Sequence, residues 1–255
     1  CSSDLDTNEA EGTASNVVVS FDTDGFTVGN SGLSNEDGSS FVAWQWLAGG
    51  GSGSSNTAGS INTTTTTVNT TAGISISTYV GTGSAATIGH GLGVVPKFIF
   101  IKCYDSTGGD NWRAYHGANT TAPQTDYLIP NTTAATADLA TVWNDTAPTS
   151  SVFSIGTDTA VNESSKDHVA YCFAEVEGFS RLASYVGNGA SFGTPVFCGF
   201  RPAFVIIKKS SGTGSWVMYD TQRSPFNEVD DQLLANTTAA ETTGSEEIDF
   251  LGTGF

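Results

Sequence analysis

The chain contains a long internal repeat, which constrains its fold more than any other feature. The first copy begins at Gly73 and the second at Gly178. Matched positions are spaced by about 105 residues, with small drifts at loops, which indicates a duplicated structural unit. These positions include Tyr79 and Tyr185, Pro96 and Pro202, Trp112 and Trp216, and Tyr115 and Tyr219.

The first residues of the chain match the end of the complete copy. The segment around Phe26 matches that around Phe153, and Phe41–Trp46 matches His168–Phe173. The spacing here is roughly 127 residues, because an extra Gly-, Ser- and Thr-rich stretch follows. This stretch, residues 49–72, is either a flexible loop or, in its Thr-rich part, an edge strand.

The repeat divides the chain into four predicted segments. Residues 1–48 are the C-terminal half of a unit, and residues 49–72 connect them to the next unit. Residues 73–177 form a complete unit, and residues 178–255 are the N-terminal part of a further unit. A β-unit cut in half leaves open sheet edges, which proteins avoid. We therefore expect residues 1–48 to complete the unit that begins at Gly178, within one chain or between chains. The alternative is that the chain is a window on a longer repeat protein.

Composition and periodicity both predict strands. Gly is abundant, with 30 residues, and Met occurs once. Short apolar or alternating runs predict strands at Val17–Phe21, Phe26–Val28, Phe41–Leu47, Ile74–Tyr79 and Phe98–Ile101. Because turn residues separate these short runs, we predict an all-β fold of tandem β-sandwich or jelly-roll-like repeats, each of roughly 105 residues. A β-propeller is disfavoured because the unit is longer than a blade.

The charge balance limits the classes of partner. The chain has 26 acidic and 9 basic residues, a formal net charge of −17. Such a surface repels phosphate backbones and anionic lipids, so we expect neither nucleic acid nor a membrane as a partner. An acidic surface also suits an extracellular setting.

The cysteines follow no metal-binding or disulfide spacing. Cys103, Cys172 and Cys198 lie in apolar runs, where cysteine acts as a small buried hydrophobe. Cys1 is either the lipidated start of a lipoprotein or an interior residue of a longer protein. The repeat favours the second interpretation, because the chain begins in mid-unit.

No catalytic, cofactor-binding or metal-binding set emerges from the sequence. Asp22–Gly25 is similar to part of a calcium loop, but the later ligands of that loop are missing in register, so a hairpin turn is the simpler interpretation. The three histidines, at positions 90, 116 and 168, are not repeated in the second copy and are expected to be structural. Glu175 and Glu177 share one strand face, where solvated carboxylates are expected rather than a glycosidase pair.

Three tryptophans are the candidates for contact with carbohydrate. Trp112, Trp143 and Trp216 could stack on sugar rings if their faces were exposed. However, Trp112 and Trp216 occupy equivalent positions in the two copies, which favours a role in the core.

Several phrases of the sequence resemble a repeat found in structural proteins of tailed bacteriophages, notably marine ones. The resemblance covers residues 73–255 and 1–48, and it is carried by the segments Thr78–Lys102, Asn111–His116, Asn131–Asn162 and His168–Ser180. Such proteins are usually described as tail-fibre or virion-associated proteins with tandem β-domains. The resemblance implies a virion-exposed structural or host-recognition role, and it carries over no catalytic residues.

We therefore expect a non-enzymatic, extracellular virion protein of a tail fibre or similar appendage that acts in host attachment. The expected partners are further copies of the chain, other virion proteins, and a glycan or protein of the host surface; no cofactor is expected. The alternative is a secreted or surface-anchored bacterial adhesin or filament subunit that assembles by strand sharing.

Overall fold

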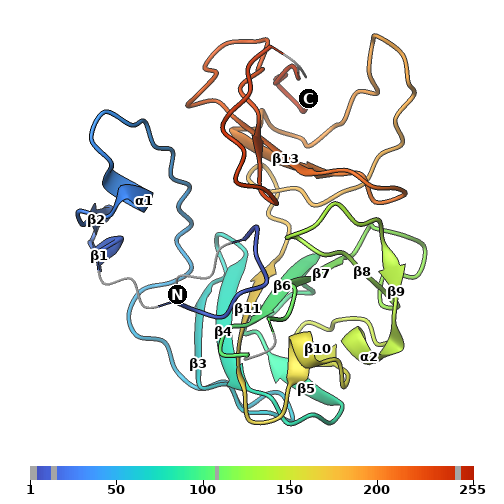
Figure 1. The fold of residues 1–255 in the computed structure, drawn as a ribbon. Coiled ribbons are helices and arrows are strands. Elements are labelled where there is room, and N and C mark those ends of the chain that lie inside the picture. Colours follow the sequence, from blue (N-terminus) through green and yellow to red (C-terminus); the bar gives the residue numbers. More distant parts are fainter. Residues whose placement is uncertain (1–4, 13–15, 107–108, 245–247) are drawn as a thin grey trace. The chain divides into compact units, whose positions relative to one another are not determined.

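The computed structural model describes residues 5–12, 16–106, 109–244 and 248–255 (Figure 1). The described residues form fourteen strands and three single-turn helices, which confirms the predicted all-β fold. They fall into two compact units, Glu11–Trp46 and Leu47–Phe255, the second of which also includes residues up to Ala10. Among these residues, every helix is too short and too polar to cross a bilayer.

A five-stranded antiparallel sheet forms the centre of the larger unit. Its strand order is β3-β4-β11-β6-β7, so β11 lies in the middle (Figure 1). The strands are β3 (Thr65–Asn69), β4 (Ile74–Val80), β6 (Phe98–Cys103), β7 (Arg113–His116) and β11 (Asp167–Phe173). The Thr-rich part of residues 49–72 is therefore the edge strand β3 rather than a linker.

Smaller elements cover one face of this sheet. They are β5 (Ala86–Gly89), β8 (Asp126–Tyr127), β9 (Ala137–Asp138), α2 (Ala140–Trp143), β10 (Val152–Ile155) and α3 (Thr159–Asn162). β5 pairs with β10, and β8 pairs with β9. The core between the layers joins Tyr79, Ile99 and Ala170 of the sheet to Ile88 of β5 and Phe153 of β10, all of which are buried.

A second, three-stranded sheet follows Gly178. It has the order β12-β13-β14, formed by β12 (Phe204–Lys208), β13 (Trp216–Asp220) and β14 (Leu233–Leu234). Its own core contains Val205, Tyr219, Val229 and Phe250. A separate apolar cluster joins it to the first sheet, with Ala114 and Leu128 on one side and Trp216 and Ala235 on the other.

The small unit contains β1 (Val18–Phe21), β2 (Phe26–Val28) and α1 (Gly32–Asn35). β1 and β2 form the antiparallel hairpin that the sequence predicts. The prediction of a strand at Phe41–Leu47 is wrong for this structure, because these residues form neither helix nor strand. A strand needs hydrogen-bonded neighbours, and β1 and β2 pair only with each other within this unit.

We call residues 73–177 the complete copy and residues 178–255 the open copy. Hydrogen bonds that involve the backbone agree at equivalent positions of the two copies. The Trp112 amide donates to Asn131 Oδ1 (3.2 Å), and the Trp216 amide donates to Asn236 Oδ1 (2.7 Å). The backbone bond from Gly117 N to Lys97 O in the complete copy matches that from Thr221 N to Ala203 O in the open copy. Likewise, Lys102 Nζ donates to Asp110 O in the complete copy, and Lys208 Nζ donates to Gly214 O in the open copy.

The small unit matches the end of the complete copy in the same way. Asn35 Nδ2 donates to Gly29 O (2.8 Å), as Asn162 Nδ2 donates to Gly156 O (2.7 Å). The helices α1 and α3 are also capped alike, since the side chains of Ser31 and Asp158 each accept a hydrogen bond from the backbone amide two residues later. Tandem sandwiches, and the completion of one unit by residues 1–48, stay predictions.

Candidate functional site

The three tryptophans predicted as carbohydrate contacts lie in the interior. Trp112 and Trp216 are each 5 % exposed, and Trp143 is 2 % exposed. The indole Nε1–H of Trp143 donates to Asp126 O (3.0 Å), and that of Trp216 donates to Ile129 O (3.2 Å). Their ring faces are therefore covered by protein, as expected for the core role, and they offer no platform for a sugar.

The three histidines are structural. His90 is fully buried, with Nε2 3.2 Å from Thr149 O and Nδ1 accepting from Leu92 N (3.2 Å). His168 stacks on Tyr79, with ring centroids 5.1 Å apart. Burial lowers the pKa of His90, His116 and His168, so all three are neutral at pH 7. Their hydrogen bonds hold turns and loops.

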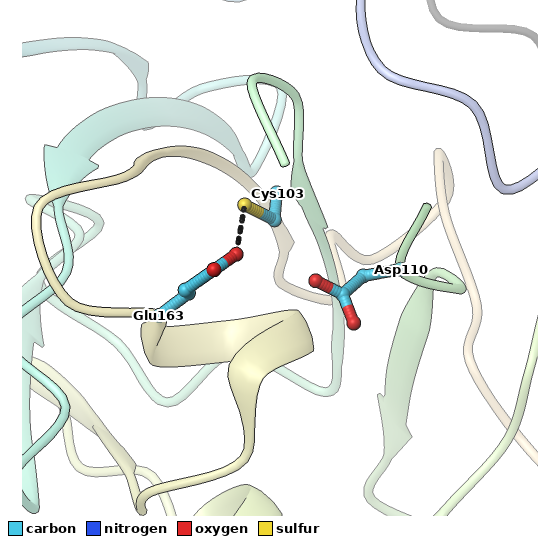
Figure 2. A group of neighbouring side chains, drawn as sticks. All are labelled: Cys103, Asp110 and Glu163. Carbon is cyan, nitrogen blue, oxygen red and sulfur yellow. Dashed lines mark hydrogen bonds between the residues drawn. The ribbon is translucent and has the colours of Figure 1, made fainter. Parts of the chain in front are cut away.

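One group of potential ligand atoms was not predicted from the sequence. Cys103, Asp110 and Glu163 bring a thiol and two carboxylates within 4.8 Å of one another (Figure 2). The three residues come from β6, the loop before β7 and the end of α3. No sequence spacing indicates such a group, because the fold alone brings these segments together.

The thiol in this group is a hydrogen-bond donor rather than a nucleophile. Burial, and then the charges of Asp105, Asp110 and Glu163, raise the pKa of Cys103 to about 12. The protonated Sγ lies 3.9 Å from Glu163 Oε2, to which it donates (Figure 2). Attack on a substrate requires the thiolate, so this environment does not activate Cys103.

The other acidic candidates have structural partners. Asp22 N donates to Gly25 O (2.8 Å) in the turn between β1 and β2, and the Asp22 carboxylate accepts from Thr27 Oγ1 (2.8 Å). This is the hairpin turn that the sequence favours over a calcium loop. Glu175 accepts a hydrogen bond from Leu182 N (3.0 Å) and pairs with Arg181 (3.4 Å). Neither Glu175 nor Glu177 lies in a strand, so the prediction that they share a strand face is wrong.

The cysteines follow the prediction in two of three cases. Cys103 and Cys172 are fully buried, whereas Cys198 is half-buried, and all three are free thiols. Cys1 lies outside the described residues.

The most unusual surface of the described residues lies in the open copy. Several of its large apolar side chains are exposed, including Val186 (86 %), Phe192 (91 %) and Phe197 (75 %). The segment Arg181–Val186 aligns with β4 of the complete copy but forms no strand. Strand β12 has β13 on one side and is the edge of its sheet. Exposed apolar residues beside an open sheet edge are typical of a surface that binds another segment of chain.

A family model described as a domain of unknown function, DUF7483, matches residues 2–255. The chain belongs to this family. The match spans the small unit, the complete copy and the open copy of this DUF7483 chain in a single stretch. No curated protein and no solved structure matches the chain.

Proposed function

We propose that the chain is a non-enzymatic structural repeat protein of a bacteriophage virion, in a tail fibre or similar appendage that acts in host attachment. The observation that carries the proposal is the agreement of hydrogen bonds at equivalent positions of the two copies. Trp112 with Asn131, and Trp216 with Asn236, make the same bond about 105 residues apart. Repetition of one β-unit lengthens an appendage without requiring a catalytic group.

Chemistry and charge agree with this role. Among the described residues, the buried thiol of Cys103 is protonated at neutral pH, because burial and the neighbouring carboxylates raise its pKa. The histidines are neutral, and backbone groups hold His90 and His168. The net charge of −17 opposes binding to nucleic acid inside a particle and suits an exposed position. The viral assignment itself rests on the resemblance of the sequence to phage tail repeats.

Localisation on particles tests this proposal. Antibodies raised against the purified chain, with gold-labelled secondary antibody, should decorate the tail appendages of phage particles that encode it. They should also lower adsorption to host cells. Particles that lack the protein by mass spectrometry would reject the proposal.

The second candidate is a secreted or surface-anchored bacterial adhesin or filament subunit. The exposed apolar side chains of the open copy favour it as much as they favour a virion protein, because both assemble through such surfaces. Fractionation of the source cell discriminates the two. A chain found on the cell surface without phage induction supports the adhesin, and a chain found only in particles supports the virion protein.

A further inference from the structure

A polar pocket lies where the complete copy meets the start of the open copy. It has a volume of about 320 Å³. It is lined by Lys97, Gly117, Ala118, Glu175 and Arg181–Ser184, and we call it the Lys97 pocket. Small-molecule sites have volumes of roughly 300–1,000 Å³, so this pocket has room for one small ligand, about the size of a monosaccharide.

Backbone hydrogen bonds hold the walls of the pocket at one end of the five-stranded sheet. Lys97 N donates to Phe173 O (2.7 Å) at the end of β11, and Gly117 N donates to Lys97 O (2.7 Å). Glu175 follows β11 directly, and its carboxylate accepts from Leu182 N (3.0 Å). The side chains of the pocket therefore project from a backbone that is fixed before any ligand binds.

The pocket is locally positive in an acidic chain. It contains Lys97 and Arg181, two of the nine basic residues, and one acidic residue, Glu175. Two positive charges and one negative charge give a local charge of +1, against −17 for the whole chain. A small anion is therefore attracted to this place, although most of the surface repels it.

The two cations of the pocket differ in how they are held. Arg181 Nε lies 3.4 Å from Glu175 Oε1, so the guanidinium already has a carboxylate partner. Lys97 is exposed, and among the described residues no hydrogen bond or ion pair reaches its ammonium group. The Lys97 ammonium is thus the cation that can pair with an incoming anion.

The open copy shows that the fold does not require a lysine at this position. Pro96 matches Pro202, so Lys97 matches Ala203. The carbonyl oxygens of both residues accept the same backbone bond, from Gly117 N in the complete copy and from Thr221 N in the open copy. Because the turn forms equally with alanine, the charge of Lys97 is left for a role other than folding.

The other polar groups of the pocket suit a ligand that carries hydroxyl groups. The Glu175 carboxylate only accepts hydrogen bonds, and it has more acceptor sites than Leu182 N and Arg181 occupy. The Ser184 hydroxyl both donates and accepts. A sugar hydroxyl can donate to Glu175, whereas an acidic peptide or a phosphate chain brings several negative charges, which Glu175 repels.

We propose that the Lys97 pocket binds a sugar that carries one carboxylate, such as a uronic acid unit of a surface glycan. Lys97 pairs with the carboxylate of the sugar, and Glu175 and Ser184 bond to its hydroxyl groups. The inference rests on the proposed function, since attachment to a host brings the chain into contact with surface glycans. It gives that function a specific site and a chemical class of receptor.

Titration of the purified chain with small sugars tests the proposal. The probes are methyl glucuronide and methyl glucoside, which differ only in the carboxylate, and a tetra-aspartate peptide, with binding measured by calorimetry. We expect methyl glucuronide to bind about tenfold more tightly than methyl glucoside. Equal affinities for the two sugars, no binding of methyl glucuronide, or tighter binding of the peptide would overturn the proposal.

Two lysine variants assign the binding to the pocket. Lys97→Ala introduces the residue that the open copy has at Ala203, so its unfolding transition should match that of the unaltered chain. It should weaken methyl glucuronide binding about tenfold. Lys209→Ala removes another exposed lysine outside the pocket and should change the affinity less than about twofold. Equal losses in the two variants would reject the pocket as the site.

These titrations and the labelling of particles fail independently. A chain that decorates tail appendages but does not bind methyl glucuronide would reject the Lys97 pocket and leave the virion role in place. A chain that binds methyl glucuronide through Lys97 but is absent from particles would reject the virion role and leave the pocket in place.

Discussion

The complete and open copies have closely related sequences, yet the segment that matches β4 forms a strand in only one of them. Tyr79 is fully buried in β4, whereas its counterpart Tyr185 is 44 % exposed and lies in no strand. The hairpins that follow, β6–β7 and β12–β13, keep the same register. The difference lies at β11, which pairs with β4 and β6, whereas no strand of the described residues lies between Arg181–Val186 and β12. Local sequence thus suffices to form the hairpins β6–β7 and β12–β13. The segment that corresponds to β4 forms a strand only where β11 lies beside it.

The glycine pair, Gly81 and its counterpart Gly187, should give the largest difference between the copies. Gly81→Val drives a side chain into Glu163 O, and we expect it to lower the free energy of unfolding by about 3 kcal/mol. Gly187→Val should change it by less than about 0.5 kcal/mol, because the space beside it is open. Urea denaturation measured by tryptophan fluorescence checks both. Equal losses would show that Gly187 is already packed.

The tyrosine pair should give the next largest difference. Tyr79 Oη donates to Val161 O (2.7 Å) in the interior. Tyr79→Phe leaves that carbonyl without its donor and should cost about 2 kcal/mol. Tyr185→Phe, at a half-exposed ring that packs edge-on against Phe255, should cost little. A comparable loss at Tyr185, measured by urea denaturation, would show that its hydroxyl is bonded as in Tyr79.

The asparagine pair should instead behave alike. Asn131 and Asn236 each accept from a tryptophan backbone amide and are each 8 % exposed. Asn131→Ala and Asn236→Ala should each lower the free energy of unfolding by about 1.5 kcal/mol. Thermal unfolding by calorimetry measures both losses. A loss confined to Asn131 would mean that the second hairpin does not use the matched bond.

Between pH 6.5 and 5, acid should destabilise the complete copy through its histidines, because all three belong to it. Burial lowers their pKa in the folded state, so the unfolded chain binds more protons below its own pKa of about 6.5. Stability is therefore full above that pH and falls as the pH drops toward the folded-state values. We expect a slope of about 1 kcal/mol per pH unit for each histidine. His168→Phe, which copies Phe41, should reduce the slope between pH 6.5 and 5 by about a third.

The sequence predicts those parts of the fold that depend on neighbouring residues. The alternation in Ile74–Tyr79 and the apolar run Phe98–Ile101 correspond to β4 and β6. The hairpin at Asp22–Gly25 was also predictable, since its turn residues determine it. Identical positions of Trp112 and Trp216 indicated the core, where both rings lie.

The parts that were not predicted depend on distant segments. The single-turn helices α1 and α3 are too short to give a helical pattern, and each begins at a polar cap, Ser31 or Asp158. The group of Cys103, Asp110 and Glu163 exists only after β6 and α3 are packed. Phe41–Leu47 has the pattern of a strand but forms none here, since a strand also requires its neighbours.

Amide hydrogen exchange of Arg181–Val186, compared with that of β4, tests the central claim most directly. β4 pairs along its length with β11, so its amides should be strongly protected. Arg181–Val186 forms no strand, so its amides should exchange rapidly, while those of β13 stay protected. Protection of Arg181–Val186 equal to that of β4 would contradict the account.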